Sequence, residues 1–172
     1  GAVITHENRI VGEGFTSPYG GPHAEVRAID SVRDKSLLKK ATLYVTLEPC
    51  CHYGKTPPCT DKILSSGIPR VVVGVQDPHT KVGGKGISIL KEAGCEVITG
   101  VLQKQCEYHH RRFLTYHRKK RPYIILKWAQ SADGYMAPVR SERGRAPEPY
   151  WIFSPLSRQL THKWRSEEAG IL

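Results

Sequence analysis

The sequence has no long hydrophobic run and few aromatic residues. Of its 172 residues, 39% are hydrophobic and 8% aromatic. The longest apolar run, 71–75, is far shorter than the roughly 20 residues of a membrane-spanning helix. A charged segment followed by an apolar one, the pattern of a signal peptide, is also absent from the N-terminus. We therefore expect a globular, cytoplasmic protein with no membrane partner.

Acidic residues are scarce relative to basic ones, with 16 against 26 and a formal net charge of +10. The excess is concentrated in the segments 109–112 and 118–121. Such a balance is compatible with a polyanionic ligand. However, no aromatic-rich nucleic-acid-binding motif accompanies these charges. The pattern favours a solvated helix face and a connector, and we predict no nucleic-acid partner.

Cysteine is present in an odd number, five, and two of the five are adjacent, Cys50 and Cys51. An odd count with adjacent residues does not fit the disulfide framework of a secreted domain. The cysteines therefore indicate metal chemistry in a reducing compartment.

Apolar periodicity predicts alternating strands and helices in the first two thirds of the chain. The segment 71–75 is apolar on both faces, as expected for a central parallel strand. Alternation of this kind predicts a layered α/β domain. The predicted strands are 1–5, 10–15, 43–47, 71–75 and 96–99, and the predicted helices are 23–33, 58–66, 84–93 and 103–116.

The pattern restarts after Pro122. We predict a strand over 123–129, a Gly- and Pro-rich stretch up to Pro149 and a helix over 155–168. These roughly 50 residues are too few for an independent domain of about 100–200 residues. The prediction is a first domain over 1–116, a basic connector over 117–121 and the opening of a truncated second domain over 122–172. Both ends of the sequence indicate a fragment, so we expect partner chains or missing segments, and a homo-oligomer.

Three short segments contain the parts of a zinc site that activates water: His23-Ala24-Glu25, Glu48-Pro49-Cys50 and Cys59. Catalytic zinc takes three protein ligands and leaves the fourth position open. His23, Cys50 and Cys59 supply three ligands, and Glu25 is placed to move protons without binding the metal. The predicted helices that begin near 23 and 58 should bring these residues together, and helix N-termini favour the thiolate form of cysteine.

Two structural alternatives remain open at this point. Cys51 and His52 could complete a closed, four-ligand structural site. Structural sites, however, usually space their cysteines by two to four residues, whereas eight separate Cys50 from Cys59. The other alternative is that the histidine and cysteines are unrelated core residues, since free cysteine is often buried.

The run 48–59, E-P-C-C-H-Y-G-K-T-P-P-C, resembles the deaminase half of the bifunctional riboflavin-biosynthesis deaminase-reductases. That family is marked by P-C-x-H-x-G-x-T-P-P-C after H-A-E. The resemblance covers essentially the whole chain. Further matching segments are 73–78, 82–86, 93–95, 121–123 and 127–134.

The resemblance implies a three-layer, cytidine-deaminase-like α/β domain with a mixed central sheet, followed by the start of a dihydrofolate-reductase-like α/β domain. It implies one Zn²⁺ per deaminase site. The implied substrate is a small molecule, a diaminopyrimidinone with a ribosyl 5-phosphate. His52, Lys55 and Thr56 match the positions that contact this substrate. A charge and a hydroxyl suit phosphate recognition, although a solvated loop lysine is the alternative for Lys55.

In the second domain, Lys127, Trp151 and Arg165 match positions that contact cofactor or substrate in the reductase, and the implied cofactor is NADPH. The alternatives are a core tryptophan and a helix-surface arginine. The segments that would hold the NADPH phosphates lie beyond the given sequence, so these residues alone should not reduce a substrate.

The sequence departs from the family pattern at three residues. Thr16 stands where histidine is common, Cys51 where a small polar residue is common, and Phe153 where a hydroxyl-bearing residue is usual. The N-terminal helix of the family and its Asn-containing loop are also missing. These departures leave parts of both pockets in question.

Two further functions use similar residues. A tRNA or single-stranded nucleic-acid base deaminase has the same metal chemistry, but typically with P-C-x-x-C. A non-catalytic, zinc-stabilised binding module would need the metal but not Glu25.

Overall fold

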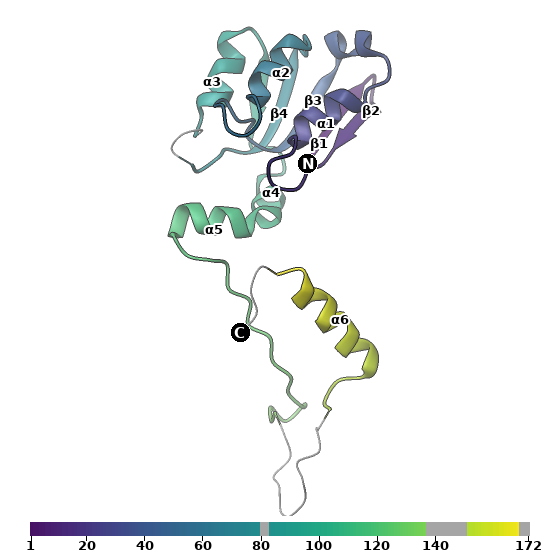
Figure 1. Ribbon diagram of the computed structural model, residues 1–172, viewed down its shortest axis with the longest axis vertical. Helices are drawn as coiled ribbons and strands as arrows, with labels where there is room; N and C mark the ends of the chain where they lie inside the picture. The colour runs from purple at the N-terminus through teal and green to yellow at the C-terminus, as the bar shows by residue number, and fades with distance from the viewer. Residues whose placement is uncertain (80–82, 137–150, 169–172) are drawn as a thin grey trace, which may run out of the picture. The chain divides into compact units, whose positions relative to one another are not determined.

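The computed structural model describes residues 1–79, 83–136 and 151–168 (Figure 1). The chain forms two compact units, Gly1–Tyr123 and Ile124–Leu172. Most of the Gly- and Pro-rich stretch predicted up to Pro149 lies outside the described residues. The functional residues of the predicted deaminase all fall within the first unit.

The first unit is built on a five-stranded mixed sheet with the strand order β2-β1-β3-β4-β5. The second and third strands along this order, β1 and β3, are antiparallel, as are β1 and β2. β4 is parallel to both of its neighbours, β3 and β5. This arrangement confirms the predicted mixed sheet and the central parallel strand. The strands are β1 Ala2–His6, β2 Arg9–Gly14, β3 Thr42–Leu47, β4 Arg70–Val75 and β5 Glu96–Thr99.

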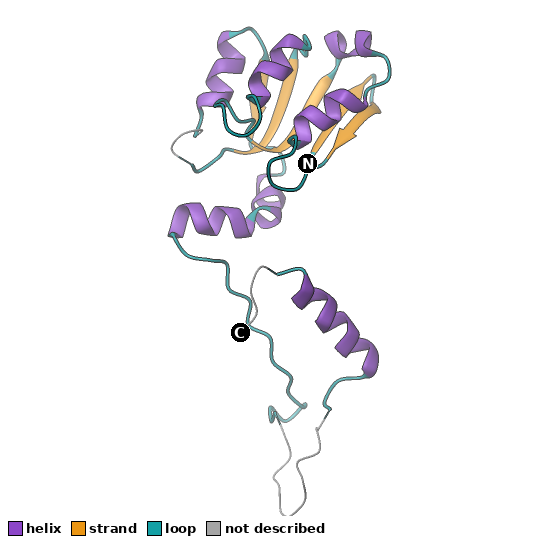
Figure 2. Ribbon diagram, in the orientation of Figure 1, coloured by secondary structure: helices purple, strands orange, loops and turns teal. Residues whose placement is uncertain are grey.

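Three helices cover one face of the sheet (Figure 2): α1 Ala24–Ser31, α2 Cys59–Ser65 and α3 Lys85–Glu92. Alternate apolar residues of the strands point toward them and form the core. A short 3₁₀ helix, η1 Lys35–Lys40, precedes β3 and was not predicted. The core residues of lowest exposure include Ile4, Leu43, Ile63, Val71, Val73 and Leu90.

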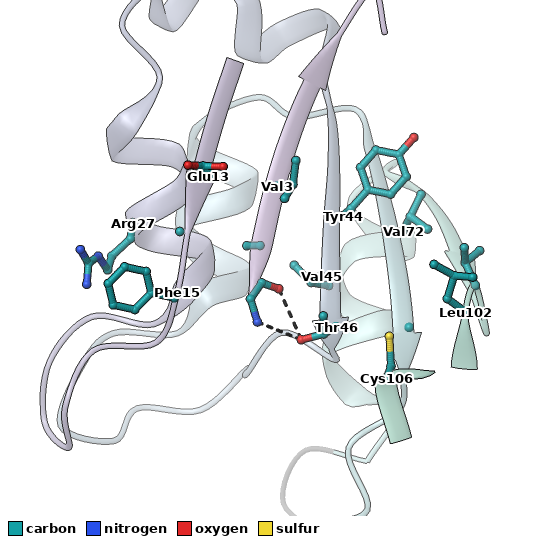
Figure 3. Close-up of a pocket in the computed structure, with 15 residues that line it drawn as sticks. Val3, Glu13, Phe15, Arg27, Tyr44, Val45, Thr46, Val72, Leu102 and Cys106 are labelled. Carbon is teal, nitrogen blue, oxygen red and sulfur yellow. Dashed lines mark hydrogen bonds between the residues drawn. The ribbon is translucent and has the colours of Figure 1, made fainter. Parts of the chain in front are cut away.

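The opposite face of the sheet is contacted by α4 Gln103–His109, which packs on β4. Gly74 makes this contact close, because a Cβ there would run into the Cys106 side chain and lie 3.0 Å from the Thr46 carbonyl oxygen. Beyond α4, the same face borders a cavity of about 560 Å³ (Figure 3). The side chains that line it include Val3, Phe15, Tyr44, Val72 and Leu102.

The prediction of one continuous helix over 103–116 is wrong. The chain forms two helices, α4 and α5 Arg111–Lys119, which meet at His110 with φ −90° and ψ 14°. Apolar periodicity is similar on both sides of the break, so local sequence does not reveal it. The break depends on tertiary contacts, since α4 packs on β4 while the His110 side chain bonds to β3.

In the second unit, the predicted helix over 155–168 is confirmed as α6 Pro155–Ser166. Its N-cap is Ser154, whose Oγ accepts a hydrogen bond from the Ser157 N–H. The predicted strand over 123–129 is wrong, because the backbone there is irregular. The described residues of this unit contain no strand with which 123–129 could pair, and a strand without a pairing partner leaves its backbone groups unbonded.

No helix within residues 1–79, 83–136 and 151–168 combines the length and hydrophobicity that spanning a membrane requires.

Candidate metal centre

The three predicted metal ligands come from different elements and converge at the ends of two helices. His23 is the N-cap residue of α1, Cys50 follows β3, and Cys59 is the first residue of α2. The His23 Nδ1 atom lies 3.4 Å from Cys50 Sγ and 3.3 Å from Cys59 Sγ. The ligand atoms all lie within 4.8 Å of one another.

This donor set fits zinc. Tetrahedral zinc with bonds of about 2.0–2.3 Å separates its ligand atoms by roughly 3.3–3.8 Å, which matches both histidine–cysteine distances. Among the described residues, Cys51 and His52 do not belong to the group. The described residues therefore favour a three-donor group over a closed four-donor site, and the three donors lie together rather than apart in the core. One nitrogen and two sulfur donors leave a tetrahedral ion with one open position.

The protonation of the two thiols is strongly asymmetric. The hydrogen bonds that Cys50 receives from the Cys59 side chain, from His23 and from the Cys59 backbone N–H lower the pKa of the Cys50 thiol to about 4. The interaction with Cys50, together with burial, raises the pKa of Cys59. The hydrogen bond to Cys50 also raises the pKa of His23. A bound cation would favour the deprotonated form of all three ligands.

Glu25 lies in the first turn of α1, two residues after His23, and is 8% exposed. Burial raises the pKa of its carboxyl group. Both Glu25 and His23 line a cavity of about 320 Å³ at the metal centre. A buried carboxyl group with a raised pKa holds a proton more readily than an exposed one, which suits a general acid–base group.

The structure separates the three predicted substrate-contacting residues. His52 lines the cavity beside the metal ligands. Lys55 is exposed in the same loop, and its Nζ atom lies 4.1 Å from the centre of the Tyr19 ring. Thr56 is half-buried, and its carbonyl accepts a hydrogen bond from the Gly54 N–H. Thr16, which departs from the family pattern, also lines the cavity.

Sequence reasoning missed several contributors to the cavity wall, among them Thr46, His110 and Phe113. His110 was expected on a solvated, basic helix face, but it is half-buried. The spacing of Cys106, His110 and Leu114 by four residues places them on one helix face. That face is the signal which could have identified His110.

Glu48, which precedes the Cys50 loop, was noted only as part of a motif. Its carboxylate is 4% exposed and accepts hydrogen bonds from the backbone N–H groups of Asp77, Gly84 and Ile87. The last two belong to the start of α3, whose N-cap residue, Gly84, has no side-chain cap of its own. Glu48 therefore caps α3 from a distant part of the chain. The segment V-G-G-K-G has no side chain that could cap the helix that starts there, and this lack was the signal in the sequence for a cap from elsewhere.

The proposed reductase residues lie in the second unit. The Lys127 Nζ atom is 4.7 Å from the centre of the Phe153 ring. Phe153 is one of the residues that depart from the family pattern. Trp151 is 61% exposed, with the Arg158 guanidinium 3.9 Å from its ring centre. A core position for Trp151 is therefore wrong. Arg165 is exposed on the last turn of α6.

Comparison with known proteins agrees with this centre. Residues 1–75 match the family described as the cytidine and deoxycytidylate deaminase zinc-binding region. This match contains His23, Glu25, Cys50 and Cys59. The fold and the metal-binding residues together define a zinc-binding domain of the cytidine deaminase type.

The similarity to riboflavin biosynthesis proteins extends over the full chain. The chain is 46% identical over 172 residues to RibD of Aquifex aeolicus and 41% identical to RibD of Escherichia coli. Among solved structures, a deaminase/reductase from Thermotoga maritima has 45% identity and a TM-score of 0.82, covering 95% of this chain and 45% of that one. Over its full length, the chain is therefore similar to proteins of riboflavin biosynthesis. It spans 46% of the Aquifex protein and 45% of the Escherichia protein.

Proposed function

We propose that the first unit hydrolyses the ring amine of a phosphoribosylated diaminopyrimidinone, releasing ammonia. The observation that carries this proposal is the convergence of His23, Cys50 and Cys59 beside the buried carboxyl group of Glu25. The relatives at 37–47% identity are riboflavin biosynthesis proteins, which supports the choice of substrate.

The chemistry divides between the metal and the protein. Zinc, when bound by His23, Cys50 and Cys59, supplies a Lewis acid that makes water nucleophilic near neutral pH. Glu25 takes a proton from the attacking water and passes it to the ring nitrogen as the water oxygen bonds to the ring carbon. It then moves the remaining hydroxyl proton to the leaving amine, so that the C–N bond breaks, a carbonyl forms and ammonia departs. Burial raises the pKa of the Glu25 carboxyl group, so the carboxylate takes up a proton more readily than an exposed one would.

The loop between the cysteines is proposed to select the substrate. His52 lines the cavity and would contact the substrate next to the metal centre. Lys55 and Thr56 continue the same loop, where a cation and a hydroxyl suit the phosphate of the ribosyl arm. The ring of Tyr19 lies against the Lys55 ammonium group and restricts its position.

For the whole protein, we propose a second, NADPH-dependent reductase activity in a homo-oligomer. Lys127, Trp151 and Arg165 would take part in it. The domain boundary at the basic connector 117–121, and a reductase domain that begins at 122, are part of the same proposal. The solved Thermotoga relative, whose name includes both activities, supports it.

The experiment that tests the deaminase is the substitution Glu25→Gln in the full-length protein. Zinc content and fold should persist, because glutamine keeps the shape of the side chain and Glu25 is not among the metal ligands. Ammonia release should fall at least about a hundredfold, the usual contribution of general acid–base catalysis. Glu92→Gln, at an exposed residue at the end of α3, is the matched control and should keep full activity.

Unchanged ammonia release in the Glu25→Gln protein would contradict the role given to Glu25. A nucleic-acid deaminase would instead show affinity that falls steeply with salt concentration, because binding releases counterions from the phosphate backbone. A single phosphoribosyl group predicts only a shallow salt dependence.

A further inference from the structure

The wall of the metal-centre cavity contains a histidine that the proposed chemistry does not use. His110 lies where α4 meets α5, and its side chain lines the cavity together with Glu25 and Cys50. Phe113, in the first turn of α5, lines the same cavity. Two flat rings from one helix junction therefore border the space beside the metal ligands.

The position of His110 is fixed by contacts on both sides of its backbone. Its Nε2 atom lies 2.8 Å from the Thr46 hydroxyl oxygen on β3. Its backbone N–H donates to the Cys106 carbonyl at 2.9 Å, and its carbonyl accepts from Leu114. Cys106 in turn packs against Gly74, where only a hydrogen side chain fits. The sheet therefore determines where the imidazole lies.

The His110 ring is uncharged at neutral pH. Burial and the neighbouring His109 lower its pKa to about 4. A neutral imidazole and a phenyl ring on the wall of one cavity offer flat, weakly polar surfaces, which suit a planar, uncharged heterocycle better than a phosphate. This chemistry complements the cationic Lys55 in the cysteine loop.

We propose that His110 and Phe113 form the surface against which the pyrimidine ring of the substrate packs, and that they hold the ring for attack beside Glu25. This inference rests on the proposed deaminase function and adds two substrate-contacting residues to it. Thr46 acts as a positioning residue, because its hydroxyl anchors the imidazole.

The test compares His110→Ala, Phe113→Leu and Thr46→Val in the full-length, zinc-loaded protein. Loss of one ring contact should raise KM roughly tenfold for His110→Ala, with a smaller change in kcat, and less for Thr46→Val. Calorimetric binding of the substrate to a Glu25→Gln background should weaken by the same factor. Zinc stoichiometry should stay at the wild-type value, since none of the three residues belongs to the ligand group.

Gln105→Ala is the control, because Gln105 is exposed on α4 and does not line the cavity. Its KM should equal the wild-type value. A KM within twofold of wild type for both His110→Ala and Phe113→Leu would overturn the inference. If His110→Ala does not fold, His110→Asn and Phe113→Leu carry the comparison with the same criterion. A wild-type protein that releases no ammonia from this substrate would refute the deaminase function itself, whereas an active wild type with unchanged variants refutes only the ring contacts.

Discussion

Replacing Glu48 by glutamine should destabilise the fold although it changes only one atom. The carboxylate accepts three backbone hydrogen bonds, at 3.1 Å from Asp77, 3.0 Å from Gly84 and 3.3 Å from Ile87. Oε2 accepts the first two and Oε1 accepts the third. An amide has a single acceptor oxygen, so one of these positions would become an NH₂ group facing a backbone N–H.

The magnitude follows from the better of the two amide orientations. With the oxygen toward Asp77 and Gly84, glutamine loses the bond from Ile87 and leaves that donor unsatisfied. A hydrogen bond to a charged group contributes about 1.5–3 kcal/mol, and an unsatisfied buried donor costs about 1–3 kcal/mol. The two figures are not added, because both describe the loss of the hydrogen bond between Ile87 and Glu48. The bonds from Asp77 and Gly84 remain but become weaker without the negative charge. We therefore expect the free energy of unfolding to fall by about 2–4 kcal/mol.

The assay is urea unfolding of the zinc-loaded protein, followed by circular dichroism, for Glu48→Gln and for Glu92→Gln as the exposed control. The control should stay within about 0.5 kcal/mol of wild type. A loss below about 1 kcal/mol for Glu48→Gln, at an unchanged m-value, would refute the capping role of this carboxylate. Weaker zinc binding should accompany the loss of stability, because Glu48 is two residues from the ligand Cys50.

Three further predictions concern other contacts of the first unit. Gly86→Ala should lower the free energy of unfolding by about 1–3 kcal/mol, measured by denaturant titration, because the new Cβ would run into the Pro49 carbonyl oxygen. Cys59→Ser should abolish stoichiometric zinc, measured by mass spectrometry, and lower the melting temperature, because metal binding and folding are coupled. Retained zinc would show that Cys59 is not a ligand. Lowering the pH from 7 to 4.5 should reduce the free energy of unfolding of the wild type by about 1–2 kcal/mol more than that of His110→Asn. The reason is that His110 gains a proton near pH 6.5 in the unfolded chain, whereas its pKa in the folded protein is about 4. Partial exposure of the ring reduces the size of this effect.

The sequence predicted the elements whose patterns are local. The strand 71–75 was correctly placed inside the sheet, where β4 lies between β3 and β5, because continuous apolarity is required of a strand covered on both faces. The helix starts near His23 and Pro58 were also correct. Since both follow loops at the same edge of the sheet, they implied that the metal ligands would meet there. The three-donor group agrees with that expectation.

The features that sequence did not reveal depend on contacts between distant residues. The break at His110 arises where α4 packs on Gly74 and the imidazole bonds to Thr46, a partner 64 residues away. The cap that Glu48 provides to Gly84 spans 36 residues. Neither partner is indicated by the local pattern around the other. The strand predicted over 123–129 fails for the related reason that β structure requires a neighbour, which apolar alternation alone does not supply.

The metal centre and the Glu48 cap hold the two ends of the short segment 48–50. Cys50 is tied to His23 and Cys59, which lie 27 and 9 residues away in the chain. Two residues earlier, Glu48 is tied to the start of α3. Each set of contacts restricts the position of the intervening Pro49, whose carbonyl oxygen lies directly against Gly86. Zinc binding should therefore stabilise the α3 contact and the cap should strengthen zinc binding, because two constraints on one segment share the entropy cost of ordering it.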